Sequence, residues 1–541
     1  KDLFVYLYAA SMKFKSTRGI SGCTLEQCIS SGYALDGGLF MPEEIPKVTI
    51  DDLLKWKSLT FQGLCVEVLS LFVGDEIPRT DLKTLVKQGF DDFTDPSVIP
   101  LVPIGEKKGS KLFSAELFHG QSYAFKDFGQ QVTCRMLDYF CRKNNRRATV
   151  VVSTTGDTGP AAIAAVRGTT NLRIICFYPK GQVSRLQERQ MTTVASDNVF
   201  VFPFEGGGDD MDGPIKTMTT DEKLLKKENL CSVNSINIGR IIAQTVHYFW
   251  CYLQVHSAEE IKSGVEATFS IPTGAMGNVT AGMMARTMGL PIQKFVCGVN
   301  ANDILHRAVS TGEFRKLDMR RTLSEAINIQ VPYNFERVMY LLSGGQNQTE
   351  AMLKMEQTQV ITLSKDLHAK LQDWVSTYRV EDSEMLGTVQ NLWGCHKYLS
   401  DPHTAVGVNA AQKFLHGTQR PCGAVICLAT AHACKFEDAI RKALGSKFWE
   451  GTVLNDPKLM PPTAGSLQKL PEISRGTFRE GEDWTQRLRE VIEGRYPEAT
   501  LVTPHLGTLW FSNQAMAMLL GITTAVCFAA ILSKFARRSK R

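Results

Sequence analysis

The sequence lacks any C-x-x-C pair, although its 541 residues include 14 cysteines. Structural zinc sites and disulfide frameworks use cysteines at short, regular spacings, so we expect neither here. The cysteines lie mostly within apolar stretches, as Cys176, Cys297 and Cys427 do. This pattern is typical of reduced, buried thiols in a cytosol-like compartment.

The chain also lacks a concentrated charge of either sign. Its formal net charge is +6, with 21% charged residues and only short basic runs. Proteins that bind nucleic acid gather lysine and arginine on one face, so no nucleic-acid partner is expected. There is no G-x-x-x-x-G-K-[ST] loop, which disfavours nucleotide phosphoryl transfer, and no fixed-period repeat. What remains is an ordinary globular composition, long enough for two or three domains.

Residues 515–532, near the C-terminus, form an uncharged run that is rich in apolar side chains. These 18 residues reach the minimum length of a transmembrane helix, and five basic residues follow from Lys534 onward. A buried terminal helix is the alternative. We expect weak tail anchoring to an intracellular membrane, with the rest of the chain in the cytoplasm. Residues 1–11 precede Met12 and are expected to be upstream sequence outside the mature protein.

Short β-rich runs alternate with helical stretches from Leu101 onward, whereas residues 16–95 mix turns with amphipathic helix patterns. Apolar strands that alternate with helices predict a parallel sheet covered by helices, so the fold class is α/β. A final surface helix is expected within 475–494. The expected strands are 111–117, 148–153, 172–178, 267–272, 294–300 and 424–430.

Two loops that follow predicted strands have the composition of anion sites. The strand 148–153 leads into "TTGDTGP", where Pro160 suits the first position of a helix. A second strand leads into "PTGAMGN", where Gly274 and Gly277 permit a close approach of backbone to ligand. Helix N-termini at the carboxyl ends of parallel strands bind carboxylates and phosphates. An ordinary connection is the alternative for each loop.

Polar residues in two further segments are candidates for ligand contacts. In "YPKGQVSRLQERQ", Lys180, Ser184, Arg185 and Arg189 could contact a substrate anion, with a solvated helix face as the alternative. In "LATAHACKFEDAI", Thr430 ends a predicted strand.

Lys126 stands between two phenylalanines in "HGQSYAFKDFGQ", where an amphipathic helix is expected to start near Asp127. A helix N-terminus disfavours a cation, and flanking aromatic rings exclude water. Both effects lower the pKa of a lysine toward the neutral amine that a Schiff base requires. The alternative is a lysine whose stem packs on apolar neighbours while its amine stays in water.

Together these segments resemble the threonine synthase family. Its members are fold type II enzymes that depend on pyridoxal phosphate (PLP). The resemblance runs from about Ser16 to Arg489, and the "YAFKD" and "YNFER" segments look closest to the animal threonine synthase-like branch. It is carried by the ordered motifs "STRG", "HGQSYAFKD", "STTGDTGPAA", "YPKGQVSRLQERQMTT", "NSINIGRIIAQTVHYF", "PTGAMGN", "VPYNFER", "DPHTAVG" and "ATAHACKFEDA".

The resemblance implies a fold similar to the tryptophan synthase β-subunit, with parallel sheets covered by helices and an N-terminal helical domain. The expected divisions are an N-terminal domain (12–100), an α/β region with the Schiff-base lysine (101–262), an α/β region with the phosphate loop (263–493), a linker (494–514) and the tail (515–541).

The resemblance also implies roles for individual residues. Lys126 would hold PLP and act as the catalytic base, and Thr430 would face the pyridine nitrogen. The cofactor phosphate would bind Gly274, Ala275, Met276, Gly277 and Asn278. The substrate carboxylate would bind Ser153, Thr154, Thr155, Asp157 and Thr158. The substrate phosphate would bind Lys180, Ser184, Asn237 and Arg240. "TGAMGN" departs from the glycine- and asparagine-rich loop usual in the family.

The implied activity is a catabolic phospho-lyase that removes phosphate from small phosphorylated amino acids, O-phosphohomoserine and O-phosphothreonine, and yields 2-oxobutyrate and ammonia. A threonine synthase that adds water to make threonine is the first alternative. A non-catalytic secreted or membrane-tethered signalling protein is the second, although it would not require Lys126, the glycine loop and Thr430 together. The sequence does not fix the oligomeric state and is compatible with a homodimer.

Overall fold

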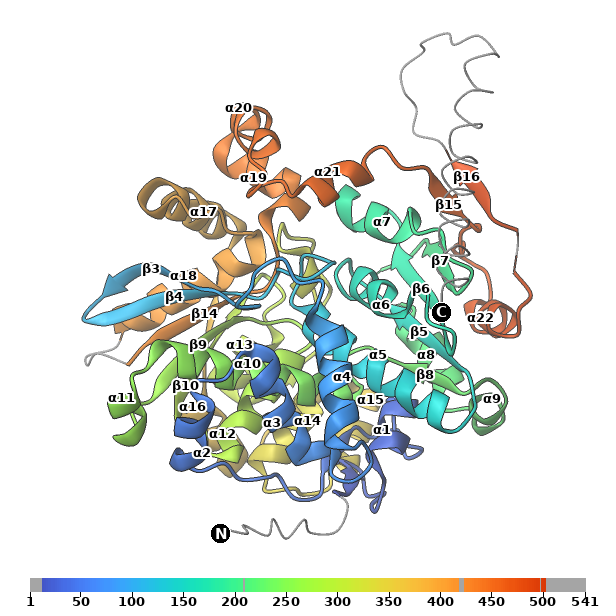
Figure 1. Ribbon diagram of the computed structural model, residues 1–541, viewed down its shortest axis with the longest axis horizontal. Helices are drawn as coiled ribbons and strands as arrows, with labels where there is room; N and C mark the ends of the chain where they lie inside the picture. Colours follow the sequence, from blue (N-terminus) through green and yellow to red (C-terminus); the bar gives the residue numbers. More distant parts are fainter. Residues whose placement is uncertain (1–11, 208–209, 418–422, 497, 503–541) are drawn as a thin grey trace, which may run out of the picture.

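The computed structural model describes residues 12–207, 210–417, 423–496 and 498–502 (Figure 1). The expected extension at 1–11, the expected tail at 515–541 and most of the expected linker lie outside these residues. Within the described ranges, no helix is both long enough and apolar enough to cross a membrane.

The larger sheet has six strands in the order β13-β10-β9-β14-β4-β3. Neighbouring strands are parallel except for β3 and β4, which form an antiparallel edge. Every residue of β9 is buried, as expected for a strand with helices on both faces. The bounds are β3 (Leu101–Lys107), β4 (Ser110–Glu116), β9 (Ala267–Pro272), β10 (Ile292–Val299), β13 (Val375–Arg379) and β14 (Val425–Ala429).

The smaller sheet has four parallel strands in the order β7-β6-β5-β8. Alternate residues of β5 face opposite sides: Val150 and Val152 join the main core, whereas Val151 packs in a second cluster that contains residues of α8 and α22. The bounds are β5 (Ala148–Ser153), β6 (Leu172–Pro179), β7 (Val199–Phe204), β8 (Leu230–Ser232), α6 (Thr158–Val166), α7 (Arg185–Thr192), α8 (Asp212–Thr219), α9 (Glu222–Glu228) and α22 (Trp484–Ile492).

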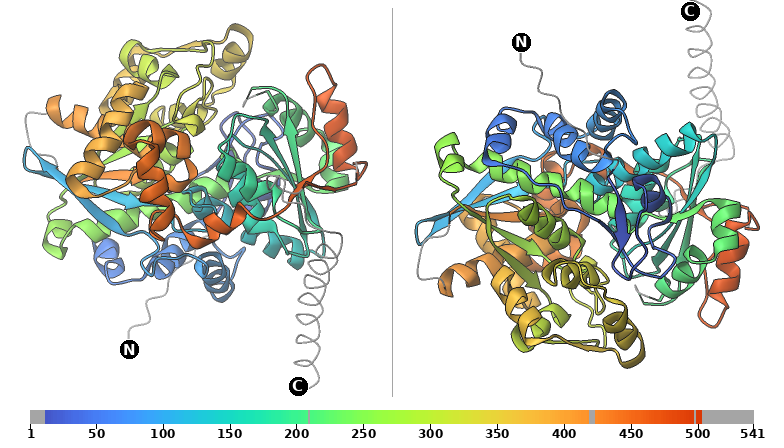
Figure 2. Two further views of the ribbon diagram at one scale, coloured as in Figure 1. Left: turned by 90° about the horizontal axis from the view of Figure 1, so that it is seen from above. Right: turned by 90° about the horizontal axis from the view of Figure 1, so that it is seen from below.

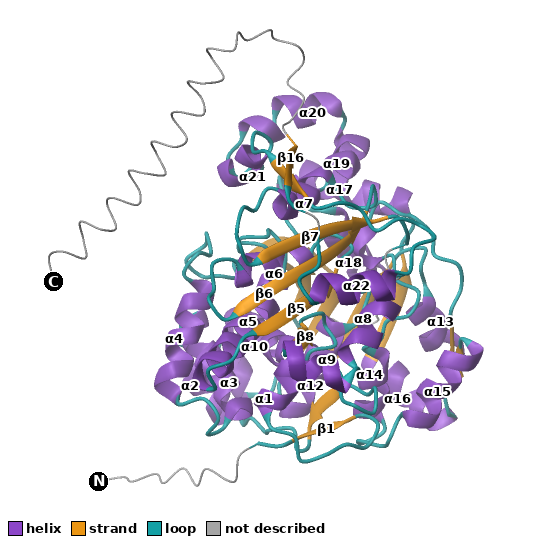
Figure 3. Ribbon diagram, turned by 90° about the vertical axis from the view of Figure 1, so that its right-hand side faces the viewer, coloured by secondary structure: helices purple, strands orange, loops and turns teal. Residues whose placement is uncertain are grey.

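Two long helices, α5 (Lys126–Lys143) and α10 (Ile238–Val255), pack against each other between the sheets. α10 also packs on α12 (Gly277–Met288), which carries the glycine loop at its N-terminus. The N-terminal helices cover this pair and begin at threonine caps such as Thr24, Thr49 and Thr60 (Figure 3). These helices are α1 (Leu25–Ser31), α2 (Ile50–Trp56), α3 (Phe61–Val73) and α4 (Arg79–Phe90), with the short strands β1 (Phe14–Ser16) and β2 (Phe40–Pro42) beside them.

The remaining elements pack on the larger sheet, on the helices beside it or on one another, and Figure 2 shows their arrangement from two further sides. α18 packs on β9, β10, β13 and β14. These elements are α11 (Ala258–Lys262), α13 (Ile304–Thr311), β11 (Glu313–Arg315), η1 (Glu325–Ile327), α14 (Phe335–Leu342), α15 (Thr349–Thr358), β12 (Val360–Thr362), α16 (Lys365–Trp374), α17 (Asp382–His396), α18 (Pro402–Gly417), η2 (Ala433–Lys435), α19 (Glu437–Leu444), α20 (Ser446–Gly451), η3 (Val453–Asn455), α21 (Pro462–Leu467), β15 (Glu472–Ser474) and β16 (Thr500–Val502).

The predicted fold class, α/β with helix-covered parallel sheets, is confirmed. All six predicted strands are present within two residues of their expected limits. The chain crosses between the sheets in a way that the sequence did not indicate. Strands β3 and β4 come from the expected region 101–262, yet they pair in the larger sheet beside β14. The expected region 101–262 therefore contributes strands to both sheets.

Candidate active site

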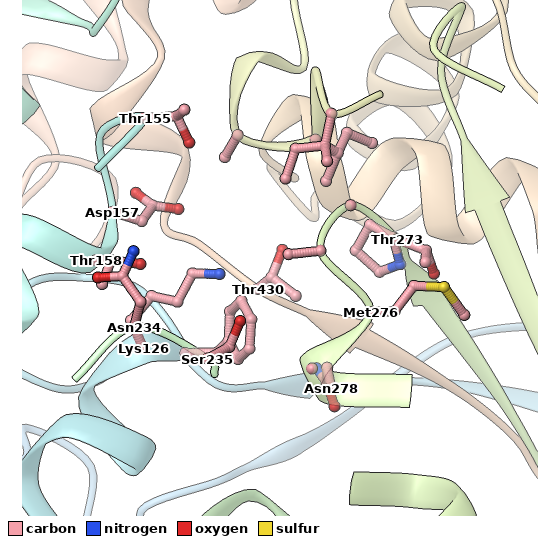
Figure 4. Close-up of a pocket in the computed structure, with 18 of the residues that line it drawn as sticks. Lys126, Thr155, Asp157, Thr158, Asn234, Ser235, Thr273, Met276, Asn278 and Thr430 are labelled. Carbon is pink, nitrogen blue, oxygen red and sulfur yellow. The ribbon is translucent and has the colours of Figure 1, made fainter. Parts of the chain in front are cut away.

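A cavity lies between the two sheets, where the loops after β5, β9 and β14 meet. Figure 4 shows the side chain of Lys126 reaching into it, with Thr155, Asp157 and Thr158 on one side and Met276 on the other. The structure brings together thirteen residues predicted from the sequence. They are Lys126, Ser153, Thr154, Thr155, Asp157, Thr158, Arg240, Gly274, Ala275, Met276, Gly277, Asn278 and Thr430.

Lys126 is the first residue of α5, one residue before the predicted start. Its amine lies 4.1 Å from the centroid of the Phe125 ring. Burial lowers the pKa of Lys126 from 10.5 to about 7, and the positive charges of Arg240 and Lys435 act in the same direction, against Asp157. A large fraction of this amine is therefore neutral at neutral pH, as a nucleophilic lysine requires.

The lowered pKa of Lys126 predicts the pH dependence of cofactor binding. Only the neutral amine attacks an aldehyde, so the rate of PLP binding to cofactor-free protein should rise with pH and level off above about 7. The measurement is the initial growth of visible absorbance after mixing at a series of pH values. An ordinary lysine would instead give a rate that keeps rising toward a midpoint near 10, and that outcome would contradict the assignment.

The loop after β9 approaches its neighbours too closely for side chains at its glycines. A Cβ on Gly274 would lie 3.1 Å from the Cα of Ile327, and one on Gly277 would lie 2.9 Å from the Cβ of Ser235. Met276 adopts a left-handed conformation with φ of 62°, which turns the chain into α12. The first backbone N–H groups of α12 thus face the cavity without acceptors from their own helix, an arrangement that suits a phosphate.

Several buried polar atoms at this end of the cavity have no hydrogen-bond partner among the described residues. They are Nε of Arg240, both amide atoms of Gln244 and Nδ2 of Asn278. Arg240 is 1% exposed, and burial lowers the pKa of its guanidinium to about 10. Gly129 leaves room for it, since a Cβ there would lie 2.6 Å from Nε of Arg240. A buried donor without a hydrogen-bond partner costs free energy unless a ligand accepts from it. The unpaired donors of this wall therefore suit an anion.

The loop between β5 and α6 presents hydroxyl groups to the cavity, whereas the carboxylate of its Asp157 contacts other side chains. Asp157 is 2.7 Å from the amine of Lys435 and accepts a 2.9 Å hydrogen bond from Gln187. Lys435 holds the pKa of Asp157 below its usual value despite burial. An ionised carboxylate repels a substrate carboxylate, so the substrate contact expected for Asp157 stays a prediction that the geometry of its side chain does not favour. Asp157 holds Lys435, and the hydroxyls of Thr155 and Thr158 stay available.

Thr430 is held by a chain of buried hydrogen bonds that begins at η1. His403 Nε2 accepts a 2.9 Å bond from the Ala326 N–H, so its Nδ1 carries the proton donated to Asp401 at 2.8 Å. Asp401 also accepts the hydroxyl of Thr404, whose oxygen accepts the Thr430 N–H at 3.2 Å. This chain fixes the loop that carries Thr430 relative to the segment that covers Gly274.

Five residues predicted from the sequence do not line this cavity. Two of them, Arg185 and Arg189, both pair with Glu472. The other three are Lys180, Ser184 and Asn237. Lys180 lies 3.8 Å from Glu205 on the outer surface, and the hydroxyl of Ser184 caps α7. The buried amide of Asn237 donates to the carbonyls of Ile29 and Ser232 and accepts from Gly239. The substrate-phosphate role expected for these three residues stays a prediction without support from this geometry, whereas Arg240 is placed at the cavity.

Three residues that shape the site were not predicted from the sequence: Gln244, His403 and Lys435. Gln244 lies one helical turn after Arg240, so the i, i+4 spacing was a usable signal. His403 and Lys435 lie within the quoted segments "DPHTAVG" and "ATAHACKFEDA", but only the fold shows that they meet η1 and Asp157. Pro160 is the third residue of α6, because the helix starts at Thr158.

The donors of the cavity fit PLP. The α12 N-terminus and the unpaired Asn278 amide suit its phosphate, Lys126 suits its aldehyde and the Thr430 side chain faces the same space.

Comparison with known families gives three adjoining matches. Residues 13–90 match "Threonine synthase N terminus", residues 95–430 match "Pyridoxal-phosphate dependent enzyme" and residues 404–482 match "Threonine synthase, C-terminal". The middle match alone covers more than half of the chain and contains every predicted site residue.

Individual relatives agree over nearly the same span. Threonine synthase-like 2 from Rattus norvegicus is 40% identical over 489 residues, 89% of this chain and 97% of that protein. Threonine synthase from Saccharomyces cerevisiae is 34% identical over 471 residues, 80% of this chain and 90% of that protein. A crystal structure of PLP-bound threonine synthase from Brucella melitensis is 32% identical with a TM-score of 0.79 and covers 90% of this chain and 99% of that chain.

Proposed function

This chain belongs to the threonine synthase family of PLP-dependent enzymes, and from that premise we propose that it is a catabolic phospho-lyase. Its substrates are O-phosphohomoserine and O-phosphothreonine, and its products are 2-oxobutyrate, ammonia and inorganic phosphate. The observation that carries the proposal is the presence, in one cavity, of a lysine whose pKa is about 7 and of an arginine that has no carboxylate partner among the described residues.

Each residue has a task in this reaction. PLP, when bound, supplies the electron-withdrawing ring that makes the substrate α-proton acidic. The neutral amine of Lys126 accepts that proton. Thr155 and Thr158 donate hydroxyl hydrogen bonds to the substrate carboxylate at the N-terminus of α6. Arg240 and Gln244 bind the phosphate that leaves, since both have unpaired donors there.

Threonine synthase activity differs only in the steps after phosphate is lost. Threonine forms when water adds at Cβ before release, whereas 2-oxobutyrate and ammonia form when the unsaturated product leaves first and hydrolyses in solution. The resemblance to the threonine synthase-like branch implies the lyase. In support of it, the chain is 40% identical to threonine synthase-like 2 and 34% identical to the yeast threonine synthase. The free, mostly buried cysteines support a reducing compartment, and a cytoplasmic location is part of the proposal.

Product analysis tests the proposed reaction. Purified holoenzyme is given O-phosphohomoserine or O-phosphothreonine, and phosphate, 2-oxobutyrate and threonine are measured together. We expect 2-oxobutyrate to equal phosphate, with no threonine above background. Equal amounts of threonine and phosphate would replace the lyase with a synthase, and absence of phosphate release from both substrates would overturn the proposal.

A further inference from the structure

A second cavity lies beside the segment that leads into the Lys126 helix, and it shares no lining residue with the cavity described above. Its volume is about 330 Å³. Its walls are the turn Gly120–Tyr123, Ile163 of α6, Arg167 directly after α6, Gln190 of α7, and residues of α21. Figure 1 labels these three helices. A space of this size holds one small molecule of the dimensions of a free amino acid.

The inner wall has an unused hydrogen-bond acceptor. Gln190 is 8% exposed, and its Nε2 donates a 3.0 Å hydrogen bond to the carbonyl oxygen of Ser122. That bond fixes the amide orientation, and it leaves Oε1 buried without a partner among the described residues. A buried carbonyl oxygen without a donor is costly, so this atom calls for a ligand O–H or N–H. Ile163 and Val194 make the surrounding wall apolar.

At the mouth of the cavity, the side-chain amide of Gln121 lies between the carboxylate of Asp92 and the guanidinium of Arg167. Gln121 donates through Nε2 to the carboxylate of Asp92 and accepts through Oε1 a 3.2 Å hydrogen bond from Arg167. Neither charged group forms a salt bridge with another described residue, although Asp92 also attracts the more distant Arg135. The amide of Gln121 thus offers a donor to Asp92 and an acceptor to Arg167. The α-ammonium and α-carboxylate of an amino acid offer the same pair, with full charges.

We propose that this cavity binds a free α-amino acid with a short side chain that carries a hydroxyl group. The ammonium replaces the Gln121 donor at Asp92, and the carboxylate replaces the Gln121 acceptor at Arg167. The ligand hydroxyl donates to Oε1 of Gln190, and its remaining carbon atoms contact Ile163 and Val194. L-threonine meets all of these demands, and L-valine has the same shape without the hydroxyl.

The place of the cavity gives its ligand a direct contact with the catalytic segment. Tyr123 has φ of 56°, and its N–H donates to Gly120 to close a tight turn three residues before Lys126. The carbonyl of Tyr123 accepts the N–H of His432, two residues after Thr430. A ligand that displaces Gln121 therefore rests on the turn that positions both Lys126 and Thr430.

The test is calorimetric titration of the holoenzyme with L-threonine. We expect one site with a Kd of about 1 mM, in keeping with a ligand of so few atoms, and binding of L-valine at least about tenfold weaker. Replacing Arg167 with glutamine should weaken threonine binding about tenfold or more. Replacing Gln121 with alanine should strengthen it severalfold, because no internal bond has to be displaced. Arg147→Gln is the matched control, since Arg147 is an exposed arginine that lines neither cavity.

The variants separate this cavity from the one that contains Lys126. Threonine bound beside Lys126 would give a titration that does not respond to Arg167→Gln, and that result would overturn the proposal. Absence of heat from 10 mM L-threonine, about ten times the expected Kd, would overturn it as well. Equal affinity for L-valine would remove the role of Gln190 and with it the hydroxyl preference.

Discussion

Replacing Lys126 with alanine is expected to lower phosphate release from O-phosphohomoserine at least about a thousandfold while the protein stays folded. The change removes the amine whose pKa burial lowers to about 7, and with it both the group that attaches the cofactor and the base for the α-proton. Steady-state phosphate release measures the loss. Thermal unfolding should show no loss of stability, since removing a buried amine also removes its desolvation cost.

Lys143→Ala is the matched control for this variant, because Lys143 is at the other end of α5 and is exposed. It should leave the rate within about twofold of the original, as expected for an exposed side chain remote from the chemistry. If Lys126→Ala retained activity within about tenfold of the unmodified enzyme, Lys126 would not be the catalytic base.

Replacing Lys435 with methionine should destabilise the protein by about 3–5 kcal/mol. The amine of Lys435 is fully buried, 2.7 Å from Asp157 and 2.9 Å from the carbonyl of Ser122. Its loss leaves the carboxylate of Asp157 buried without its cation, which costs more than the pair contributes. Chemical denaturation of the purified protein measures the change in the free energy of unfolding.

A double variant distinguishes the charge effect from loss of packing. Lys435→Met combined with Asp157→Leu removes both charges and should recover most of the lost stability. Lys442→Met, an exposed lysine on α19, is the control and should change stability by less than about 0.5 kcal/mol. A double variant as unstable as Lys435→Met alone would show that the ion pair is not the cause.

The strands and the main loops could be predicted from the sequence because their signals are local. Apolar runs such as 148–153 and 267–272 have the length and composition of buried parallel strands, and both are found there. The same holds for Lys126, whose flanking rings and helix start are visible within a few residues. The resemblance to the threonine synthase family supplied most of the other assignments among the thirteen predicted residues that lie together, because its motifs cover all three loops of the cavity.

Contact between distant segments could not be predicted from the sequence. Asp157 was predicted to bind a substrate carboxylate, because a loop at a helix N-terminus suits an anion. Its true partner, Lys435, lies 278 residues later in the chain, and only the fold shows that this cation reaches it. Likewise, "LFSAEL" reads as an ordinary strand, and nothing local reveals that β4 crosses to the larger sheet beside β14.

The role of Asn237 could not be predicted from the local sequence either. An asparagine before an amphipathic helix is equally compatible with a ligand contact and with a helix cap. In the structure its amide caps α10 and donates to Ile29 of the N-terminal helix α1, a long-range contact that no spacing predicts.

Chemical fixation shows directly whether Lys126 holds PLP in this cavity. The holoenzyme is reduced with borohydride, which converts a lysine–PLP bond into a stable secondary amine, then digested and analysed by mass spectrometry. We expect the modification on Lys126 and loss of the visible absorbance, with Lys435 unmodified. A reduced cofactor on Lys435 or any other lysine, with Lys126 free, would show that Lys126 is not the lysine that holds PLP.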